Sequence, residues 1–339
     1  MRLKRIIKVL ALVSVISVAA NAQTVSILTS GRSTSIRGLS VVDDHIAWVS
    51  GSKGFVGVTS DAGKTWAWQQ VKGFEKSDFR DIEAFSDKEA IIMSSGTPAL
   101  VLKTTDGGAN WKVNYRQADS TYFLDAMDFA DEKHGFILGD PIKGKFLLLE
   151  TKDAGETWAP VANAPVALPD EAAFAASGTC LRVNKINVTI VTGGSKSRLL
   201  MSPTRGDMVW VDQALPLSNG AASRGAFSVA YGKNETVIVG GNYAKDKRTD
   251  SVAYVISNVK NTPQRYIPQA GPQGYQSGVE YLGGDTYLAT GTPGSNLTTD
   301  GGRTWRQVDT TRFNVCRKAK RGSWILLAGD GGKVAVYKL

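Results

Sequence analysis

The chain has 339 residues, of which 42% are hydrophobic and 21% are charged, and its formal net charge is +9. This composition is too apolar for a disordered protein, and the length suffices for one large core or two smaller ones. The only two histidines, His45 and His134, lie far apart in the sequence. A histidine-rich zinc or iron site is therefore not expected, and we predict no metal and no cofactor.

The first 22 residues have the pattern of a signal peptide. A basic start (residues 1–8) precedes an apolar run (residues 9–20), and Ala20-Asn21-Ala22 fits a small-residue cleavage site. We therefore expect residues 1–22 to be removed and the protein to be exported to the periplasm or the extracellular space. Residues 23–339 would then form a single soluble domain.

Removal of the signal peptide would lower the net charge from +9 to +5, which weakens the case for a nucleic-acid partner. No later stretch approaches the about 18 consecutive apolar residues that a membrane span needs. Cys180 and Cys316 are the two cysteines. Export permits a disulfide between them, but their spacing does not imply one, and two buried thiols are the alternative.

Four segments of the chain repeat the pattern Thr-x-Asp-x-Gly-x-(Thr/Asn)-Trp. They are residues 59–66, 104–111, 151–158 and 298–305. Decayed copies are recognisable at residues 202–206, followed by Trp210, and near residues 257–266. The resulting period of 45 to 51 residues is typical of four-stranded propeller blades.

This pattern is the Asp-box, or BNR, repeat, and each copy lies between two short β-rich runs. We therefore expect a hairpin turn in which the Asp accepts backbone amide hydrogens, the Gly takes a left-handed conformation and the Trp packs between blades. The role is structural rather than catalytic. The residues concerned are Asp61, Gly63, Trp66, Asp106, Gly108, Trp111, Asp153, Gly155, Trp158, Asp300, Gly302 and Trp305.

Seven short runs mark the expected starts of the innermost strands. They are residues 36–39, 79–82, 123–126, 174–178, 224–227, 276–279 and 313–315. The chain ends after residues 333–338 without a fourth strand for the last repeat, and residues 24–28 can supply it. The sequence therefore predicts an all-β, seven-bladed propeller closed by its N-terminal strand.

Several of these runs together resemble a known family. Ser35-Ile36-Arg37-Gly38-Leu39, Phe79-Arg80-Asp81-Ile82, Gly139-Asp140-Pro141 and residues 174–179, in this order among the Asp boxes, are similar to the photosystem II stability and assembly factor family, in its exported, non-photosynthetic branch. The likeness covers residues 30–337. It implies a binding or assembly scaffold rather than an enzyme, with a protein or peptide partner such as a membrane-protein assembly intermediate. We expect a monomer.

Photosynthetic members of that family are similar in using an arginine patch on the propeller surface. In this chain Arg37 and Arg80 occupy the first two inner-strand starts, and Arg224 and Arg312 occur at comparable points. Such arginines could hold a carboxylate, a phosphate or an acidic peptide end bidentately. The alternative is that they are solvated or bond neighbouring blades, since Leu124, Ala176 and Ser277 interrupt the ring. The predicted channel-face site consists of Arg37, Arg80, Asp81, Asp125, Ser177 and Arg224.

Two enzymatic interpretations remain open. Asp boxes also occur in sialidases, whose chemistry needs three convergent arginines, a Tyr–Glu nucleophile pair and a general acid. The strings around Arg37 and Arg80 lack the proline typical of those enzymes, and Glu280 and Tyr281 are adjacent, so they point to opposite faces of a strand. An oxidoreductase would need a dinucleotide-binding loop, whereas residues 329–332 lie between two predicted strands and indicate a hairpin.

Two charged groups have simpler interpretations. Asp125, Asp128 and Asp131 are predicted to form a solvated turn, with Asp128 on a strand and Asp131 in the turn after it. The basic run of residues 317–321 is predicted to be an exposed hairpin tip that could add to an anionic docking surface.

Overall fold

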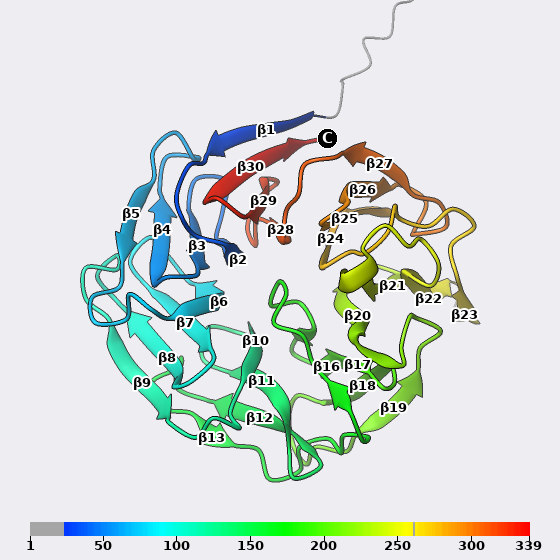
Figure 1. Ribbon diagram of the computed structural model, residues 1–339, viewed down its shortest axis with the longest axis horizontal. Helices are drawn as coiled ribbons and strands as arrows, with labels where there is room; N and C mark the ends of the chain where they lie inside the picture. The colour runs from blue at the N-terminus through cyan, green and yellow to red at the C-terminus, as the bar shows by residue number, and fades with distance from the viewer. Residues whose placement is uncertain (1–23, 260–261) are drawn as a thin grey trace, which may run out of the picture.

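The computed structural model describes residues 24–259 and 262–339, so the predicted signal peptide lies outside the described residues. Within these ranges the chain forms thirty β-strands and one short 3-10 helix. The strands make seven sheets arranged as blades in a closed ring (Figure 1), and we call the region enclosed by the inner strands the channel. The predicted seven-bladed propeller is therefore confirmed. None of the helical structure in the described ranges is long or apolar enough to cross a membrane.

Blades 1 to 3 are four-stranded antiparallel sheets whose strands follow one another in chain order. Blade 1 consists of β2 (Ile36–Val41), β3 (Ala47–Gly51), β4 (Phe55–Thr59) and β5 (Ala67–Gln70). Blade 2 consists of β6 (Asp78–Ala84), β7 (Ala90–Ser95), β8 (Ala99–Thr104) and β9 (Lys112–Gln117). Blade 3 consists of β10 (Leu124–Phe129), β11 (Gly135–Ile142), β12 (Lys145–Thr151) and β13 (Ala159–Pro160).

Blades 4 to 6 repeat this plan, with one addition in blade 5. Blade 4 consists of β15 (Leu181–Val183), β16 (Asn187–Val191), β18 (Arg198–Pro203) and β19 (Val211–Ala214). Blade 5 consists of β20 (Ala221–Tyr231), β21 (Glu235–Asn242), β22 (Ala253–Val259) and β23 (Thr262–Tyr266), and the helix η1 (Tyr243–Lys245) follows β21. Blade 6 consists of β24 (Gly278–Gly283), β25 (Thr286–Gly291), β26 (Gly294–Thr298) and β27 (Arg306–Asp309).

Two short strands extend blade 5 on its inner side. They are β14 (Glu171–Ala172) and β17 (Gly193–Gly194), and β17 pairs with β20. Glu171 is held by Arg198 through two charge-assisted hydrogen bonds of 2.8 and 2.6 Å. This buried pair anchors the chain that leads from β14 toward the channel.

Blade 7 is completed by the N-terminal strand. Its strands are β28 (Val315–Lys318), β29 (Ile325–Gly329), β30 (Lys333–Lys338) and β1 (Thr24–Thr29). β1 pairs antiparallel with β30, with Thr24 opposite Lys338 and Ile27 opposite Ala335 (Figure 1). The two ends of the chain thus close the ring and leave no unpaired edge between the first and last blades, as the sequence predicts.

The four intact Asp boxes lie in the predicted hairpins between the third and fourth strands of blades 1, 2, 3 and 6. In the first box, Asp61 accepts the backbone amide of Thr65 at 2.9 Å and its hydroxyl at 2.6 Å. Thr59 Oγ1 accepts the amide of Gly63 at 3.0 Å, and Gly63 has a φ of +78°, where glycine is favoured. The same bonds recur in the other three boxes. These bonds lower the pKa of Asp61 and Asp153 to about 2.

The box tryptophans contribute to hydrophobic clusters that join neighbouring blades. Trp111 of blade 2 meets Trp48 of blade 1 edge-to-face, with ring centroids 6.3 Å apart. Trp158 of blade 3 packs against Phe129 and joins a cluster with Ile91 of blade 2. The core is therefore a circular series of inter-blade clusters around the channel, which positions the inner strands rigidly.

One predicted inner strand is wrong. Residues 174–178 form a turn, and β15 starts only at Leu181. Gly178 has a φ of +69°, and a Cβ there would lie 2.3 Å from Asp81 Oδ2. The turn therefore packs directly on blade 2, and the segment (green in Figure 1, between β13 and β16) reaches into the ring.

Candidate functional site

β-Bulges near the start of four inner strands re-aim the side chains that line one end of the channel. The pairing register skips Arg37 in β2, Arg80 in β6, Asp125 in β10 and Phe227 in β20. A bulge leaves the extra residue unpaired and turns its side chain away from the regular alternation. We call this end, defined by Arg37, Arg80, Asp125 and the segment of residues 174–177, the arginine mouth.

Arg37 and Arg80 converge on the same stretch of backbone in the arginine mouth. Arg37 Nη1 donates to the carbonyl of Ala176 at 3.4 Å, and Arg80 Nη1 donates to that of Ala175 at 3.5 Å. Arg80 also forms an ion pair of 2.7 Å with Asp78. Arg37 forms no ion pair with any residue that the structure describes, and burial together with the charge of Arg80 lowers its pKa.

The acidic residues of the predicted site are buried behind the arginines. Asp81 is 1% exposed, and it accepts the amide hydrogens of Ile82 at 2.9 Å and Met127 at 2.7 Å. Burial raises the pKa of Asp81 to about 7. Asp125 is equally buried, and burial together with the nearby Asp140 raises its pKa well above the usual range. The Asp81 carboxyl connects blades 2 and 3, and Asp125 lies close enough to Arg80 to feel its charge.

The other two predicted residues are placed differently. Ser177 is fully buried, and its hydroxyl donates to the carbonyl of Ser277 at 2.7 Å, which ties the segment across the channel to blade 6. Arg224 donates to the carbonyl of Asn219 at 3.3 Å within its own blade. The structure therefore brings Arg37, Arg80 and Asp125 together, whereas Asp81 and Ser177 support them from the interior.

Aromatic residues that the sequence analysis did not select stand beside the arginines. Phe174 stacks on Phe227 with ring centroids 3.8 Å apart, and Phe227 meets Tyr275 at 4.8 Å. Tyr275 is close enough to Arg37 for each to influence the pKa of the other, and Tyr243 beside it is 52% exposed. Phe174 and Phe227 lie within two of the runs that were predicted to start inner strands. Their positions in these runs could have identified them as residues that line the channel.

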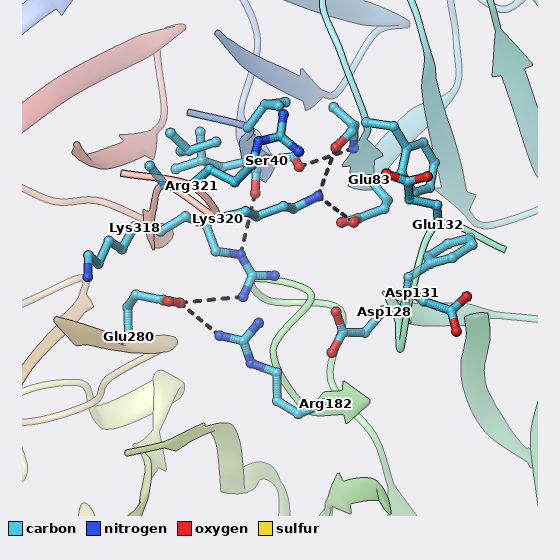
Figure 2. A pocket seen from close by; sticks show the side chains of 18 of the residues that line it. Ser40, Glu83, Asp128, Asp131, Glu132, Arg182, Glu280, Lys318, Lys320 and Arg321 are labelled. Atoms are coloured by element: carbon cyan, nitrogen blue, oxygen red, sulfur yellow. Dashed lines mark hydrogen bonds and ion pairs between the residues drawn. The ribbon is translucent and has the colours of Figure 1, made fainter. Parts of the chain in front are cut away.

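The opposite end of the channel contains a cavity of about 470 Å³ (Figure 2). The ends of the inner strands line this cavity. It lies on the side of the ring where each intact Asp box bonds the turn between the first two strands of its blade. We call it the charged mouth. Its largely buried charged residues are Glu83, Asp128, Arg182, Glu280 and Arg317.

Ion pairs connect the walls of the charged mouth. Glu280 Oε2 lies 2.8 Å from Arg182 Nη2 and 3.8 Å from Arg317 Nη1, so one carboxylate serves two guanidinium groups. Asp128 accepts the amide of Val183 at 2.6 Å, and burial raises the pKa of Asp128. Lys320 reaches across blade 1 to bond Glu83 (Figure 2).

The sequence analysis did not predict most of the charged mouth, although a sequence pattern around its charged residues can be recognised once the structure is known. Four of these five charged residues, all but Arg317, are flanked by apolar neighbours near the end of an inner strand, as in Ile82-Glu83-Ala84 and Leu181-Arg182-Val183. A charge between two apolar residues there must face the channel, because both sheet faces are covered by neighbouring blades. The convergence of five such strands follows only from the closed ring.

Two expectations about charged groups are corrected here. Asp125 and Asp128 are buried in the channel and do not belong to a solvated turn, whereas Asp131 lies in the turn after β10. In the basic run, only Lys320 and Arg321 are exposed, because Ala319 is buried and the amide of Lys320 bonds the carbonyl of Val41 at 3.0 Å. The run therefore folds onto blade 1.

Comparison with known proteins agrees with this architecture. The family model of photosynthesis system II assembly factor YCF48 matches residues 19–118. Residues 19–118 are therefore similar to this family. The resemblance predicted from the sequence is confirmed, and the matched residues include blades 1 and 2 with Arg37, Arg80 and Asp81.

Solved structures share the fold at low identity. The structure of YCF48 bound to D1 peptide matches with a TM-score of 0.65 and 17% identity over 96% of this chain and 98% of that chain. YCF48 from Cyanidioschyzon merolae matches with a TM-score of 0.59 and 16% identity over 92% and 98%. U3-55K matches with a TM-score of 0.63 and 12% identity over 93% and 98%. No curated protein matches the sequence.

Neither mouth has the ligands of a metal centre. Among the described residues, no group of three or more His, Cys, Asp or Glu side chains is arranged to hold a metal ion. Glu280 and Tyr281 are separated, as their adjacency in a strand predicts: Glu280 pairs with Arg182, and Tyr281 packs against Tyr287. The arginine mouth presents guanidinium groups, aromatic rings and backbone carbonyls.

Proposed function

We propose that this protein is an exported, non-enzymatic scaffold that binds a peptide segment of a partner protein at the arginine mouth, where Arg37 and Arg80 hold a carboxylate. The observation that carries the proposal is Arg37. A half-buried guanidinium that forms no ion pair within the described residues, and whose pKa is lowered by burial and by Arg80, gains from any anion that approaches it.

The surroundings of Arg37 fit a peptide better than a small ion. The aromatic group of Phe174, Phe227, Tyr243 and Tyr275 offers apolar surface beside the cation. Aromatic residues and arginine are the residue types enriched at the energetically dominant points of protein interfaces. A peptide could place its carboxylate on Arg37 and Arg80 and a side chain on these rings.

The present contacts of the arginines can be exchanged for a ligand. The bonds from Arg37 and Arg80 to the carbonyls of Ala176 and Ala175 are 3.4 and 3.5 Å long, which is beyond the usual range for N–H···O bonds. A carboxylate would make shorter, charge-assisted bonds to the same donors. That YCF48 has been solved bound to D1 peptide supports a peptide as the kind of ligand.

Fluorescence anisotropy with labelled D1 peptide tests the proposal, with the carboxyl end free in one sample and amidated in the other. We expect the free form to bind and Arg37→Ala to weaken its binding at least tenfold. Arg265→Ala on the exposed outer strand β23 is the matched control, since it removes the same charge away from the channel. Equal affinity of Arg37→Ala and Arg265→Ala would reject the assignment of the site.

Partner capture extends this test to the cell. The Arg37→Ala/Arg80→Ala variant should fold normally but lose the partner that the native protein captures from its own cell envelope. Fractionation of the cells tests export, which is proposed from the basic and apolar pattern of residues 1–22. A fluorogenic sialoside assay accompanies both experiments, and turnover of the sialoside would overturn the non-enzymatic proposal.

A further inference from the structure

The charged mouth has the size of a small-molecule site and is independent of the arginine mouth. Its volume of about 470 Å³ lies within the roughly 300–1,000 Å³ of typical ligand pockets. Inner strands from blades 1, 2, 3, 4, 6 and 7 contribute to its walls. These strands are fixed by the inter-blade clusters, so the cavity is rigidly framed.

Within the described residues, three carboxylates of the charged mouth each have one oxygen without a hydrogen bond. Glu83 bonds Lys320 through Oε1, Asp128 accepts the amide of Val183 through Oδ2, and Glu280 binds its arginines through Oε2. In the described part of the chain, no hydrogen bond is made by Glu83 Oε2, Asp128 Oδ1 or Glu280 Oε1. These oxygens can accept hydrogen bonds from a cation in the cavity.

Two guanidinium groups likewise keep free donors. Arg182 Nε donates to the carbonyl of Val229 at 3.2 Å, and Arg317 Nε donates to that of Leu39 at 3.4 Å. Arg182 Nη1 and Arg317 Nη2 make no hydrogen bond within the described chain. Both arginines form their ion pairs with the one carboxylate of Glu280, whereas Asp128 and Asp81 act on Arg182 without forming an ion pair with it. A second carboxylate could therefore bond the free donors of the two arginines.

The free oxygens of Glu83 and Asp128 lie in a different part of the cavity wall from the free donors of the arginines, whereas Glu280 lies beside them. Figure 2 shows Glu280 beside Arg182 on one side, and Asp128, Asp131 and Glu132 on the other. An anion alone would leave the free oxygens of Glu83 and Asp128 facing negative charge, and a cation alone would leave the free donors of Arg182 and Arg317 without an acceptor. The wall therefore matches a ligand that carries both charges.

We propose that the charged mouth binds a zwitterion of amino-acid or short-peptide size, whose carboxylate lies on Arg182 and Arg317 and whose ammonium lies on Asp128 and Glu83. Phe85, Phe129 and Tyr281 line the rest of the cavity and provide apolar contact for a side chain. This site differs in residues, location and ligand from the peptide site at the arginine mouth.

Saturation-transfer difference NMR tests the proposal on the native protein with two probe mixtures, the free L-amino acids and the dipeptides Ala-Xaa. The two mixtures distinguish a single amino acid from a short peptide. Isothermal titration then compares the strongest binder with its N-acetylated and its amidated forms. We expect saturable binding of the zwitterion and at least tenfold weaker binding of both blocked forms. Equal binding of either blocked form, or no binding from either mixture, would overturn the proposal.

Variants locate the binding. Asp128→Asn keeps an oxygen for the amide of Val183 but removes the negative charge, and Arg317→Lys keeps the positive charge but loses the planar fork. Each should weaken zwitterion binding at least tenfold, with the melting temperature as the check on folding. Arg37→Ala at the opposite mouth should leave the affinity for the zwitterion unchanged. This result would distinguish the present proposal from that for the peptide site. Unaltered affinity in both Asp128→Asn and Arg317→Lys would reject the assigned residues.

Discussion

Asp81 of β6 accepts the backbone amide hydrogen of Met127 of β10 at 2.7 Å, so that one side chain joins the inner strands of two blades. The carboxyl is 1% exposed, and its other oxygen accepts the amide of Ile82. Burial outweighs these bonds and the charge of Arg317 and raises the pKa of Asp81 to about 7. The stability of this link between blades 2 and 3 should therefore depend on pH.

The first prediction concerns this pH dependence. Between pH 4 and 7 the native state holds a proton on Asp81 that the unfolded chain has lost, so the contribution of Asp81 to the free energy of unfolding falls as pH rises through this window. Above pH 7 the contribution stays constant. Asp81→Asn should remove this part of the dependence, so that the difference in unfolding free energy between native protein and variant changes by about 2–4 kcal/mol across the window.

Urea unfolding at several pH values between 4 and 8 measures this difference. Asp207→Asn is the control, since Asp207 is exposed in the turn between β18 and β19. A constant free-energy difference between native protein and Asp81→Asn across the range would contradict the assignment.

The second prediction concerns ring closure. Deleting residues 24–30 removes β1, which pairs with β30, and removes Leu28 from the cluster that contains Trp66 and Trp324. Several kcal/mol should be lost, which at about 2–4 °C per kcal/mol lowers the melting temperature by at least about 5 °C. A synthetic peptide of residues 23–31 added in trans should restore part of the loss. An unchanged melting temperature would show that blade 7 does not need β1.

The sequence is sufficient to predict those parts of the fold that depend on local patterns. The Asp boxes specify their hairpins because, within seven residues, Thr59 accepts the amide of Gly63 and Asp61 accepts the amide and hydroxyl of Thr65. Closure by β1 is predictable because the last repeat lacks a fourth strand. The turn at residues 174–178 is not predictable in this way, because it resembles the other inner-strand starts and differs through the contact of Gly178 with Asp81.

The candidate sites are only partly visible in the sequence for a related reason. Arg37 and Arg80 are recognisable at equivalent positions, but the bulges that aim them depend on strand pairing. The charged mouth requires Asp128, Arg182 and Glu280 to meet from three blades. Residues that are 98 positions apart, such as Arg182 and Glu280, meet only because the ring closes.

The third prediction concerns one Asp box. Thr151 is 1% exposed, its hydroxyl donates to Asp153 at 2.8 Å, and the same oxygen accepts the amide of Gly155 at 2.9 Å. Thr151→Val keeps the shape but leaves that amide unpaired, which should lower the free energy of unfolding by about 1–2 kcal/mol. Thr310→Val, at an exposed position, should change it by less than about 0.5 kcal/mol. Equal urea midpoints for the two variants would contradict this role for the hydroxyl.

The fourth prediction concerns the cysteines, which are both free and buried. Burial raises the pKa of the Cys180 and Cys316 thiols, so almost no thiolate exists at neutral pH. Ellman's reagent should label neither in the native protein and both in guanidinium chloride without a reductant. Thr310→Cys supplies an exposed thiol as the positive control. Denatured, unreduced protein with no reactive thiol would reveal a disulfide instead.

The last prediction concerns the support of the arginine mouth. Glu171 is 4% exposed and bonds Arg198 twice, and it lies three residues before Phe174. Glu171→Gln leaves the Arg198 guanidinium without its main counter-ion, which should cost about 2–4 kcal/mol of unfolding free energy. Because β14 is only two residues long, amide hydrogen exchange of residues 171–178 should accelerate before the rest of the ring opens. Asp212→Asn removes the exposed partner of Arg198, so it should cost under about 1 kcal/mol and leave this exchange unchanged. If the amides of residues 171–178 exchange at the same rate in Glu171→Gln and Asp212→Asn, the buried pair of Glu171 and Arg198 does not hold the segment that Arg37 and Arg80 contact.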